Sequence, residues 1–267
     1  MNELLKIAIS ASIEAGKEIL KIYKTNFEVE YKDDESPLTM ADKNANDVIM
    51  SFLMDTGIPI LSEEGRSIPF EERKNWSELW IVDPLDGTKE FVKKNDEFTV
   101  NIALIRNKKP VMGVVYAPVL DELYFGDEEI GAYKLNDASN NIEKLSQVIN
   151  LATKLPADIK KSYFGIVASR SHLTQETTDY IDDISLGKDN IKIVSKGSSL
   201  KIVMIAEGIA DVYPRFAPTS EWDTAAGHAI VLASGGRIVQ AKSPDDEVVY
   251  NKKDILNPWF IVKNKTH

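Results

Sequence analysis

Two aspartates, Asp83 and Asp86, stand three residues apart on a turn that also contains proline and glycine. They cannot both be ordinary core residues, because a buried, unpaired carboxylate is strongly destabilising. Glu63 and Asp223 extend the pair to an anionic, all-oxygen ligand set. Hard oxygen ligands suit Mg²⁺ or Mn²⁺ rather than Zn²⁺ or copper. The leading interpretation is therefore metal-assisted phosphate chemistry.

The residues next to the two aspartates fit the same chemistry. The carbonyl of Leu85 offers one more hard oxygen ligand. Gly87 lets the backbone come close to an oxyanion, which the N–H groups of Gly87 and Thr88 would face. The Thr88 hydroxyl is placed to orient a water molecule. Two ions, with Glu63 and Asp223 completing their shells, would activate that water and stabilise the leaving oxygen of an in-line displacement.

The charge balance supports a metal. A formal net charge of −10 argues against nonspecific binding to DNA or RNA, which depends on Lys and Arg. Carboxylates about 4 Å from a phosphoryl group repel it by about 4 kcal/mol per charge pair at an effective dielectric near 20. Divalent ions invert that sign locally. An anionic substrate is therefore compatible with this site only if the site holds metal.

Length and composition indicate a soluble protein of one large or two modest domains. The chain has 267 residues, no cysteine and no apolar run near the roughly 18 to 20 residues that span a bilayer. Disulfides, thiolate nucleophiles and zinc–sulfur sites are excluded. Acidic residues interrupt the N-terminal segment, which we interpret as an amphipathic helix and not a targeting peptide. We expect a cytoplasmic monomer or homodimer, and leave open an association with the inner face of the cell membrane.

The pattern predicts an α+β unit over residues 1–135 with a largely antiparallel sheet. A first helix buries an apolar stripe, and a second over 39–54 carries Asp42 in its first turn and stops before Gly57. A short strand over 79–82 delivers Asp83. Further strands are expected over 98–105, 111–116 and 122–125. The stripe of the first helix contains Leu4, Ile7, Ala8, Ala11, Ala15, Ile19 and Ile22.

Strand and helix signals alternate in the second half, which predicts an α/β unit over residues 136–267. We expect residues 241–254 to form a charged surface excursion. The other expected elements are strands over 164–168, 192–194 and 259–262, and helices over 198–207 and 224–233.

Each motif alone has an ordinary interpretation. A DPxDG segment is most often a surface turn, Asp223 by itself suits the first turn of a helix, and Glu63 with Glu64 suits a solvated pair. Their conjunction in this order is much less easily produced by chance.

These elements resemble the signature of the lithium-sensitive, magnesium-dependent phosphatases that include inositol monophosphatase. Within that superfamily the chain is most similar to the CysQ-type 3′(2′),5′-bisphosphate nucleotidases, and the resemblance runs through nearly the whole chain. The segments that carry it are VDPLDGTKEF (82–91), EFTVNIALI (97–105), GVVYAP (113–118), KGSSLK (196–201) and YPRFAPTSEWDTAAGHA (213–229).

The resemblance implies the layered αβαβα sandwich of sugar phosphatases and a site with two or three Mg²⁺ ions, which Mn²⁺ can replace. It makes Glu63, Asp83, Asp86, Asp223 and the backbone oxygen of Leu85 the metal ligands. It also implies that Asp42 and Thr88, assisted by Glu63, hold the attacking water in position. The implied reaction converts adenosine 3′,5′-bisphosphate to AMP and phosphate, with the sulfated analogue as a second substrate.

Substrate contacts are expected beside this site. Gly197, Ser198 and Ser199 form a small polar turn suited to a second phosphate, with Lys201 and Arg215 supplying positive charge. Alternatively, Ser198 or Ser199 caps the following helix and Arg215 pairs with Glu221. The histidines His172 and His228 are expected to be structural and His267 terminal, while Phe91, Tyr213 and Phe216 are core residues or flank an adenine.

Other functions stay open from the residues alone. A covalent aspartyl-phosphate phosphotransferase needs a D-x-D-G-T loop, but here Pro84 and Leu85 put the second aspartate out of register. Inositol monophosphatase or fructose-1,6-bisphosphatase activity could use the same scaffold. A nucleotide or divalent-cation sensor would not need the water-positioning pair of Asp42 and Thr88.

Overall fold

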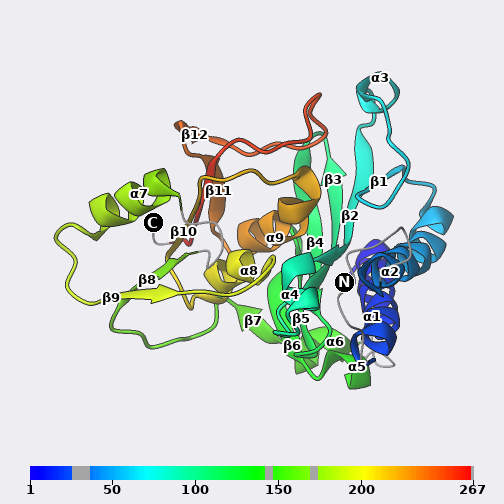
Figure 1. The fold of residues 1–267 in the computed structure, drawn as a ribbon, viewed down its shortest axis with the longest axis horizontal. Coiled ribbons are helices and arrows are strands. Elements are labelled where there is room, and N and C mark those ends of the chain that lie inside the picture. Colours follow the sequence, from blue (N-terminus) through cyan, green and yellow to red (C-terminus); the bar gives the residue numbers. More distant parts are fainter. Residues whose placement is uncertain (26–36, 142–146, 169–173, 266–267) are drawn as a thin grey trace.

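Five layers of secondary structure follow one another across the molecule: a helix pair, a sheet, a second helix pair, a second sheet and one further helix (Figure 1). They are seen in a computed structural model that describes residues 1–25, 37–141, 147–168 and 174–265. The αβαβα sandwich expected from the sequence is therefore confirmed.

The first sheet has seven strands in chain order, and it is antiparallel except for the pair β1 and β2. Its middle strands are buried on both faces, because helices cover both sides, and so they are nearly continuous apolar runs. The strands are β1 (Ile60–Ser62), β2 (Glu78–Asp86), β3 (Thr99–Arg106), β4 (Lys109–Ala117), β5 (Glu122–Asp127), β6 (Gly131–Asn136) and β7 (Thr153–Leu155).

The second sheet is mixed and has the order β12-β11-β13-β10-β8-β9. Strands β10, β8 and β9 run parallel, and β13, β11 and β12 join them by antiparallel pairing. Their bounds are β8 (Phe164–Val167), β9 (Ile191–Val194), β10 (Val212–Arg215), β11 (Arg237–Gln240), β12 (Ser243–Glu247) and β13 (Phe260–Lys263).

Helices α1 (Glu3–Tyr23) and α2 (Pro37–Leu53) cover the outer face of the first sheet, as predicted. The stripe predicted for α1 is too narrow. Leu4, Ile7 and Ile22 are only half-buried, whereas Leu5, Ile9 and Ile13 are fully buried. The reason is that α1 contacts both α2 and strand β4, so its buried face extends beyond a single stripe.

Helices α8 (Leu200–Glu207) and α9 (Glu221–Ala233) form the middle layer between the two sheets. Helix α9 lies very close to strand β4, because Gly113 has no side chain. A Cβ at Gly113 would lie 2.2 Å from the carbonyl oxygen of Ala226. This close approach fixes the start of α9, and with it Asp223, relative to the first sheet.

The outermost layer is α7 (Gln175–Ser185), which packs on the second sheet through Ile181 and Tyr180. Short helices occupy the connections: η1 (Met54–Thr56), α3 (Phe70–Arg73), α4 (Thr88–Val92), α5 (Ala138–Asn141) and α6 (Val148–Leu151).

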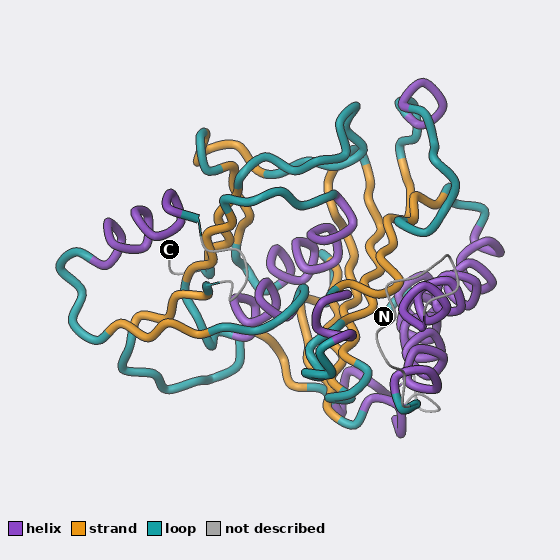
Figure 2. The backbone as a smooth tube through the Cα atoms, in the orientation of Figure 1, coloured by secondary structure: helices purple, strands orange, loops and turns teal. Residues whose placement is uncertain are grey.

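Residues 241–254 are only in part the surface excursion that we predicted, since residues 241–247 are exposed or half-buried whereas part of the stretch after them is buried. They contain strand β12, and after it Val248, Tyr250 and Asn251 are at most 2% exposed. The connection from β12 to β13 runs from the second sheet across to the first sheet (Figure 2). There the backbone N–H of Tyr250 donates to the carbonyl of Lys108 at 3.0 Å. Because many neighbouring residues are charged, the sequence pattern did not indicate that this stretch is buried.

The predicted boundary at residues 135 and 136 falls inside the first sheet, since β7 adds to it at residues 153–155. Helix α9, from the second predicted unit, also packs on this sheet. We propose that a division of the chain, if one is made, comes after β7.

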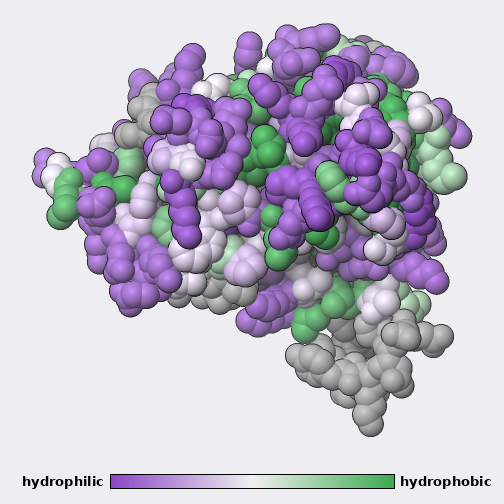
Figure 3. Space-filling model, turned by 90° about the horizontal axis from the view of Figure 1, so that it is seen from above, coloured by the Kyte–Doolittle hydropathy of each residue, from purple (hydrophilic) through white to green (hydrophobic). Residues whose placement is uncertain are grey.

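The surface seen from above is mostly hydrophilic, with hydrophobic side chains in small separate groups (Figure 3). Among the described helices, none combines the length and the apolar character needed to cross a bilayer.

Candidate active site

A bulge in strand β2 brings Asp83 and Asp86 to the same side of the sheet. Asp83 pairs with Asn101 and Asp86 with Thr99, so two residues of β2 stand opposite Val100 alone. Side chains alternate along a regular strand, and aspartates three apart would then point to opposite faces. The extra residue removes that conflict. The surface-turn interpretation is therefore wrong, since Asp83 is 1% exposed within the strand.

Asp223 joins this pair from the first turn of α9. Carboxylate oxygens of Asp83, Asp86 and Asp223 lie within 4.8 Å of one another. Asp223 also accepts a hydrogen bond from the backbone N–H of Ser220 at 2.8 Å, in a capping box. The helix-start interpretation of Asp223 is therefore confirmed, and so is its place in the cluster. Its carboxylate caps the start of α9 and also faces Asp83 and Asp86.

Glu63 lies next to this group at its open edge. Strand β1 runs parallel to β2 with Ser62 opposite Val82, and the Glu63 N–H donates to the Val82 carbonyl at 3.1 Å. The residue is exposed as a whole, but its carboxyl is close enough to Asp86 and Asp83 to interact electrostatically with both. Its place beside Asp83 is therefore set by the pairing of two neighbouring strands.

Mutual repulsion and burial raise the proton affinity of these acids. Burial, and then the charges of Asp86 and Glu63, hold the pKa of Asp83 well above its usual range. Desolvation, with Asp86 next, raises the pKa of Asp223 to about 7 and that of Glu63 to about 7. A concentration of like charge of this kind is stable only with protons or cations present.

Asp42, from the first turns of α2, completes the acidic side. It is 8% exposed, and burial, followed by the charges of Glu64 and Glu63, raises its pKa to about 8. Its Oδ1 is buried without a hydrogen-bond partner among the described atoms. Clustered carboxylates with an unmatched buried oxygen fit a divalent cation and its water ligands, because these would relieve the repulsion and supply the missing partner.

Gly87 and the turn after it close one side of the site. Gly87 has φ +99°, a conformation that favours glycine, and its Cα lies against Ser198 and Phe98 so closely that a Cβ would be 3.2 Å from the Ser198 Cβ. Helix α4 then begins at Thr88, which lines the cavity described below. The predicted contact of Gly87 and Thr88 with an oxyanion stays a prediction.

Ser198 and Ser199 face the aspartates. The Ser198 hydroxyl donates to the carbonyl of Asp86 at 2.9 Å, and that of Ser199 lies 2.8 Å from Asp86 Oδ2. Ser199 is the N-cap residue of α8, but its side chain makes no capping bond, so the capping interpretation is wrong for that hydroxyl. Both hydroxyls are thus engaged with Asp86, the last residue of β2.

Asn101 is a site residue that the sequence patterns did not identify. Its Nδ2 donates to Ser199 Oγ at 3.0 Å and lies 3.4 Å from Asp86 Oδ2. The available signal was a polar residue inside the apolar run of β3, where an unpartnered side chain would be destabilising.

A cavity of about 210 Å³ extends from Asp86 and Asp223. Its wall includes the cationic side chains of Lys89, Lys196, Lys201 and Arg215. The same wall contains the carboxylates of Asp86, Glu90 and Asp223, so a bound group would have both carboxylates and cations beside it. Such a lining suits a substrate that contacts both a metal and basic residues.

The structure sorts the remaining candidates. Phe91, Tyr213 and Phe216 all lie in the hydrophobic cores, and Tyr213 also lines the cavity. His228 is fully buried, and its Nδ1 lies 3.0 Å from the Tyr250 hydroxyl, so the expected structural role is confirmed. His172 and His267 lie outside the described residues.

The alternative partner suggested for Arg215 is wrong. Arg215 donates to the carbonyl of Pro218 at 3.4 Å. Glu221 instead forms an ion pair with Lys252 at 2.7 Å. Lys201 donates to the carbonyl of Lys196 at 3.3 Å and remains on the cavity wall.

A scan against protein families matches residues 1–266 to the inositol monophosphatase family. The chain belongs to that family. Its members depend on divalent metal ions, and the cluster of Asp83, Asp86 and Asp223 is a possible ligand group for one here.

Relatives within the inositol monophosphatase family include the 3′(2′),5′-bisphosphate nucleotidase CysQ of Salmonella typhimurium. That protein is 44% identical over 254 residues, which cover 93% of this chain and 94% of the relative. The CysQ nucleotidase of Buchnera aphidicola is also 44% identical, over 84% of this chain and 79% of its own.

Among solved structures, CysQ of Bacteroides thetaiotaomicron is 51% identical and superposes with a TM-score of 0.92, over 97% of this chain and 96% of that one. The extragenic suppressor protein suhB of Bartonella henselae, at 24% identity and a TM-score of 0.71, shows the shared fold.

Proposed function

We propose that this member of the inositol monophosphatase family is a Mg²⁺-dependent 3′(2′),5′-bisphosphate nucleotidase. It removes the 3′-phosphate of adenosine 3′,5′-bisphosphate to give AMP and phosphate, and it acts on the sulfated analogue as a second substrate. The observation that carries the proposal is the convergence of Asp83, Asp86 and Asp223, of which Asp86 and Asp223 line a cavity that also has Lys89, Lys196, Lys201 and Arg215 in its wall. Similarity to CysQ nucleotidases over nearly the whole chain supports the substrate class.

The proposed metal ligands are Asp83, Asp86, Asp223, Glu63 and the backbone oxygen of Leu85. When bound, the divalent ions supply the positive charge that offsets the carboxylates and polarises the phosphate ester. Asn101 and Ser199 hold the Asp86 carboxylate in place, and the Ser220 N–H holds that of Asp223. The chain's own contribution is thus a set of oriented oxygens whose donors are already in position.

Asp42 and Thr88 position the attacking water in this proposal, and Glu63 assists. Burial and the charges of Glu64 and Glu63 raise the pKa of Asp42 to about 8 in the metal-free protein. Divalent ions bound nearby would favour the carboxylate form, which is the form that can accept the proton as general base. The water oxygen attacks phosphorus, its proton passes to the carboxylate, and the bond from phosphorus to the 3′ oxygen breaks. The departing oxygen takes a proton from solvent and leaves as the hydroxyl of AMP.

Lys201 and Arg215 are the proposed partners of the second phosphate, and Lys196 on the same wall adds charge. The hydroxyls of Ser198 and Ser199 already contact Asp86, and the Gly197 N–H donates to Glu97 Oε2 at 2.9 Å. We therefore propose that this turn meets the substrate through the backbone N–H groups of Ser198 and Ser199, two residues that line the cavity. The wall would thereby select substrates with two separated phosphates over monophosphates.

A phosphate-release panel tests this function. The purified chain is given adenosine 3′,5′-bisphosphate, its sulfated analogue, inositol 1-phosphate or fructose 1,6-bisphosphate, each with Mg²⁺, with Mn²⁺ or with EDTA. We expect the highest kcat/KM on the adenosine bisphosphate, activity with either metal and none in EDTA. Faster turnover of inositol 1-phosphate or fructose 1,6-bisphosphate would overturn the substrate assignment. Undiminished turnover in EDTA would overturn the proposed dependence on a divalent metal.

A further inference from the structure

A strap of residues 248–257, buried at Val248, Tyr250 and Asn251, connects the two halves of the candidate metal site. It leaves strand β12 and crosses to the first sheet before it returns as β13 (Figure 2). Near its middle, Tyr250 and Asn251 are at most 1% exposed. Nothing in the proposed reaction uses this strap directly, so its extensive polar bonding indicates a different role.

The buried carboxylate of Glu221 holds the strap to the first residue of α9. Glu221 is fully buried and accepts three hydrogen bonds. These come from the backbone N–H of Asn251 at 2.7 Å, the backbone N–H of Lys252 at 2.9 Å and the Lys252 ammonium at 2.7 Å. A buried carboxylate is stable only with partners of this kind, and the three donors lie on two successive strap residues.

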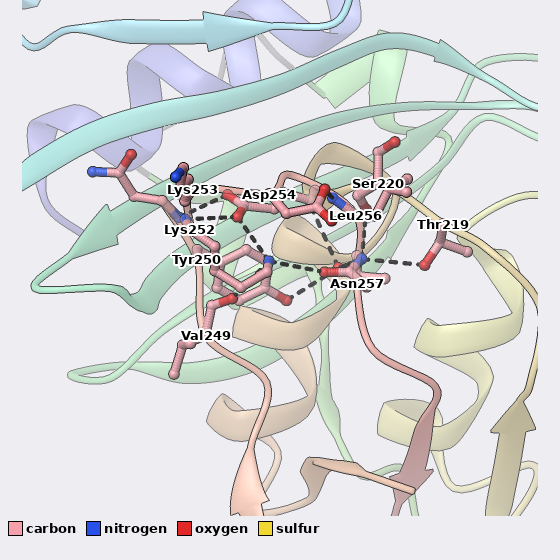
Figure 4. A network of polar contacts seen from close by, with 12 residues as sticks. Thr219, Ser220, Val249, Tyr250, Lys252, Lys253, Asp254, Leu256 and Asn257 are labelled. Atoms are coloured by element: carbon pink, nitrogen blue, oxygen red, sulfur yellow. Dashed lines mark hydrogen bonds and ion pairs between the residues drawn. The ribbon is translucent and has the colours of Figure 1, made fainter. Parts of the chain in front are cut away.

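Asn257 binds the same helix end from the other limb of the strap (Figure 4). Its Nδ2 lies 2.6 Å from the Ser220 carbonyl, 3.0 Å from Thr224 Oγ1 and 3.2 Å from Thr219 Oγ1. Its backbone N–H donates to the Thr219 carbonyl at 2.8 Å. The first turn of α9 is therefore enclosed by the two limbs.

These bonds surround the donor that orients Asp223. The Ser220 N–H donates to Asp223 Oδ2 at 2.8 Å. On one side of this N–H, Thr219 accepts from Asn257, and on the other the Glu221 N–H donates to the Ile255 carbonyl at 2.9 Å. The position of the Ser220 N–H, and hence of the Asp223 carboxylate, depends on the strap.

Near its middle, at Asn251, the strap also reaches the connection between β1 and β2, which begins at Glu63. Asn251 Oδ1 accepts from Arg73 Nη1 at 2.8 Å, and Asn251 Nδ2 donates to the Arg73 carbonyl at 2.8 Å. Arg73 is 2% exposed. Glu221, Asn251 and Arg73 thus form a chain of buried contacts from the helix that carries Asp223 to the segment that follows Glu63.

We propose that Glu221 is a positioning residue for metal binding, because its contacts with the strap fix the Ser220 N–H that orients the Asp223 carboxylate. This inference rests on the proposed function only in taking Asp223 as a metal ligand. It does not depend on which phosphate ester is the substrate.

The test compares Glu221→Gln with a matched control, Asp211→Asn. Asp211 is also buried and accepts from a lysine, a backbone N–H and an asparagine, namely Lys161, Gly165 and Asn264, but it lies on the second sheet away from α9. Both substitutions remove a buried charge with three donors, so both are expected to lower Tm in EDTA. Mn²⁺ binding is measured without substrate by electron paramagnetic resonance of the free ion.

We expect Glu221→Gln to weaken Mn²⁺ binding by about 10-fold, the lower end of the range for outer contacts of metal ligands, and Asp211→Asn to leave it unchanged. The half-saturating Mg²⁺ concentration should rise by a similar factor, while kcat at saturating Mg²⁺ stays within about twofold, because the ligands themselves are intact. A Mn²⁺ affinity equal in Glu221→Gln and the unaltered protein would overturn the proposal, as would an equal loss in Asp211→Asn.

Asn257→Ala provides a second test that keeps the buried charge, should Glu221→Gln fail to fold. It removes the side-chain contacts with Thr219, Ser220 and Thr224, and the same weakening of Mn²⁺ binding is expected. An unchanged Mn²⁺ affinity in Asn257→Ala would count against the proposal that the strap positions Asp223 for metal binding. Absence of Mn²⁺ binding by the unaltered protein would instead overturn the proposed function and this inference together.

Discussion

The Oγ of Ser199 lies 2.8 Å from the carboxylate Oδ2 of Asp86, and the same oxygen lies 2.9 Å from the carbonyl of Asp223. One hydroxyl therefore connects strand β2 with helix α9, two elements that the chain order places far apart. Asn101 donates to this hydroxyl from β3, so three elements meet at one atom.

Ser199→Ala should weaken the metal site without unfolding the protein. Loss of the contact with Asp86 removes about 1 kcal/mol of stability, and we expect about a 10-fold rise in half-saturating Mg²⁺ because the carboxylate loses a donor. Titration of phosphate release with Mg²⁺ measures this. Ser139→Ala, which removes a hydroxyl bonded to Asp121 away from the site, should leave the Mg²⁺ requirement unchanged. Equal titrations for Ser199→Ala and the unaltered protein would contradict the role.

Asp86→Asn should abolish phosphate release and still fold. It removes a central carboxylate of the cluster, and the lost repulsion should raise Tm in EDTA by about 2 to 4 °C. Calorimetry in EDTA and a phosphate assay at limiting Mg²⁺ measure the two effects. Asp121→Asn, on the loop after β4, serves as the control and should retain activity. Turnover like that of the unaltered protein in Asp86→Asn would refute the ligand assignment.

Without divalent metal, the free energy of unfolding should fall as pH rises from 6.5 to 8. Burial and the neighbouring Glu64 and Glu63 raise the pKa of Asp42 to about 8, far above its value in the unfolded chain. In this window the folded state binds the extra proton, so raising the pH removes about 1 to 2 kcal/mol through Asp42 alone. Burial lowers the pKa of His228 to about 3, so it adds an opposite slope only below about pH 6.5.

Urea unfolding in EDTA at pH 6.5, 7.2 and 8.0 measures this slope. Asp42→Asn should flatten it, and saturating Mg²⁺ should remove it, because the ion replaces the protons. If the free energy of unfolding of the metal-free protein instead rises over the same pH interval, Asp42 does not hold an extra proton in the folded state.

Arg215→Met should act on the second phosphate and spare the chemical step. We expect KM for adenosine 3′,5′-bisphosphate to rise by about 10- to 100-fold, the effect of losing a charged hydrogen bond. KM for 3′-AMP, which has no 5′-phosphate, should change little. Steady-state kinetics on both substrates measure these two KM values. Arg237→Met, at an exposed ion pair with Glu247, is the matched control. A KM that rises equally for both substrates would exclude selective recognition.

Local patterns predicted the helices well, because their information is contained in a few neighbouring residues. The stop at Gly57 is an example, since its φ of +69° ends the helical segment as a glycine commonly does. The candidate ligand residues could also be proposed, because carboxylates in apolar surroundings need cations, protons or hydrogen-bond donors beside them.

Arrangements that depend on distant pairing could not be predicted. The bulge opposite Val100 exists only through the register of β2 against β3. The burial of Tyr250 and Asn251 depends on contacts with Lys108 and Arg73 from the first sheet. Neither partner is visible from the charged sequence around the strap, so that stretch resembled a solvated loop.

The central position of α9 has a consequence for any attempt to divide this molecule. A fragment ending after β7 would retain Glu63, Asp83 and Asp86, but the inner face of its sheet would be bare where α9 packs against Gly113. Such a fragment should aggregate through its exposed apolar face and should have no phosphatase activity. Complementary pieces expressed together would regain phosphate release only by reassembling that interior, which makes enzymatic turnover a reporter of whether the separated polypeptides have recombined.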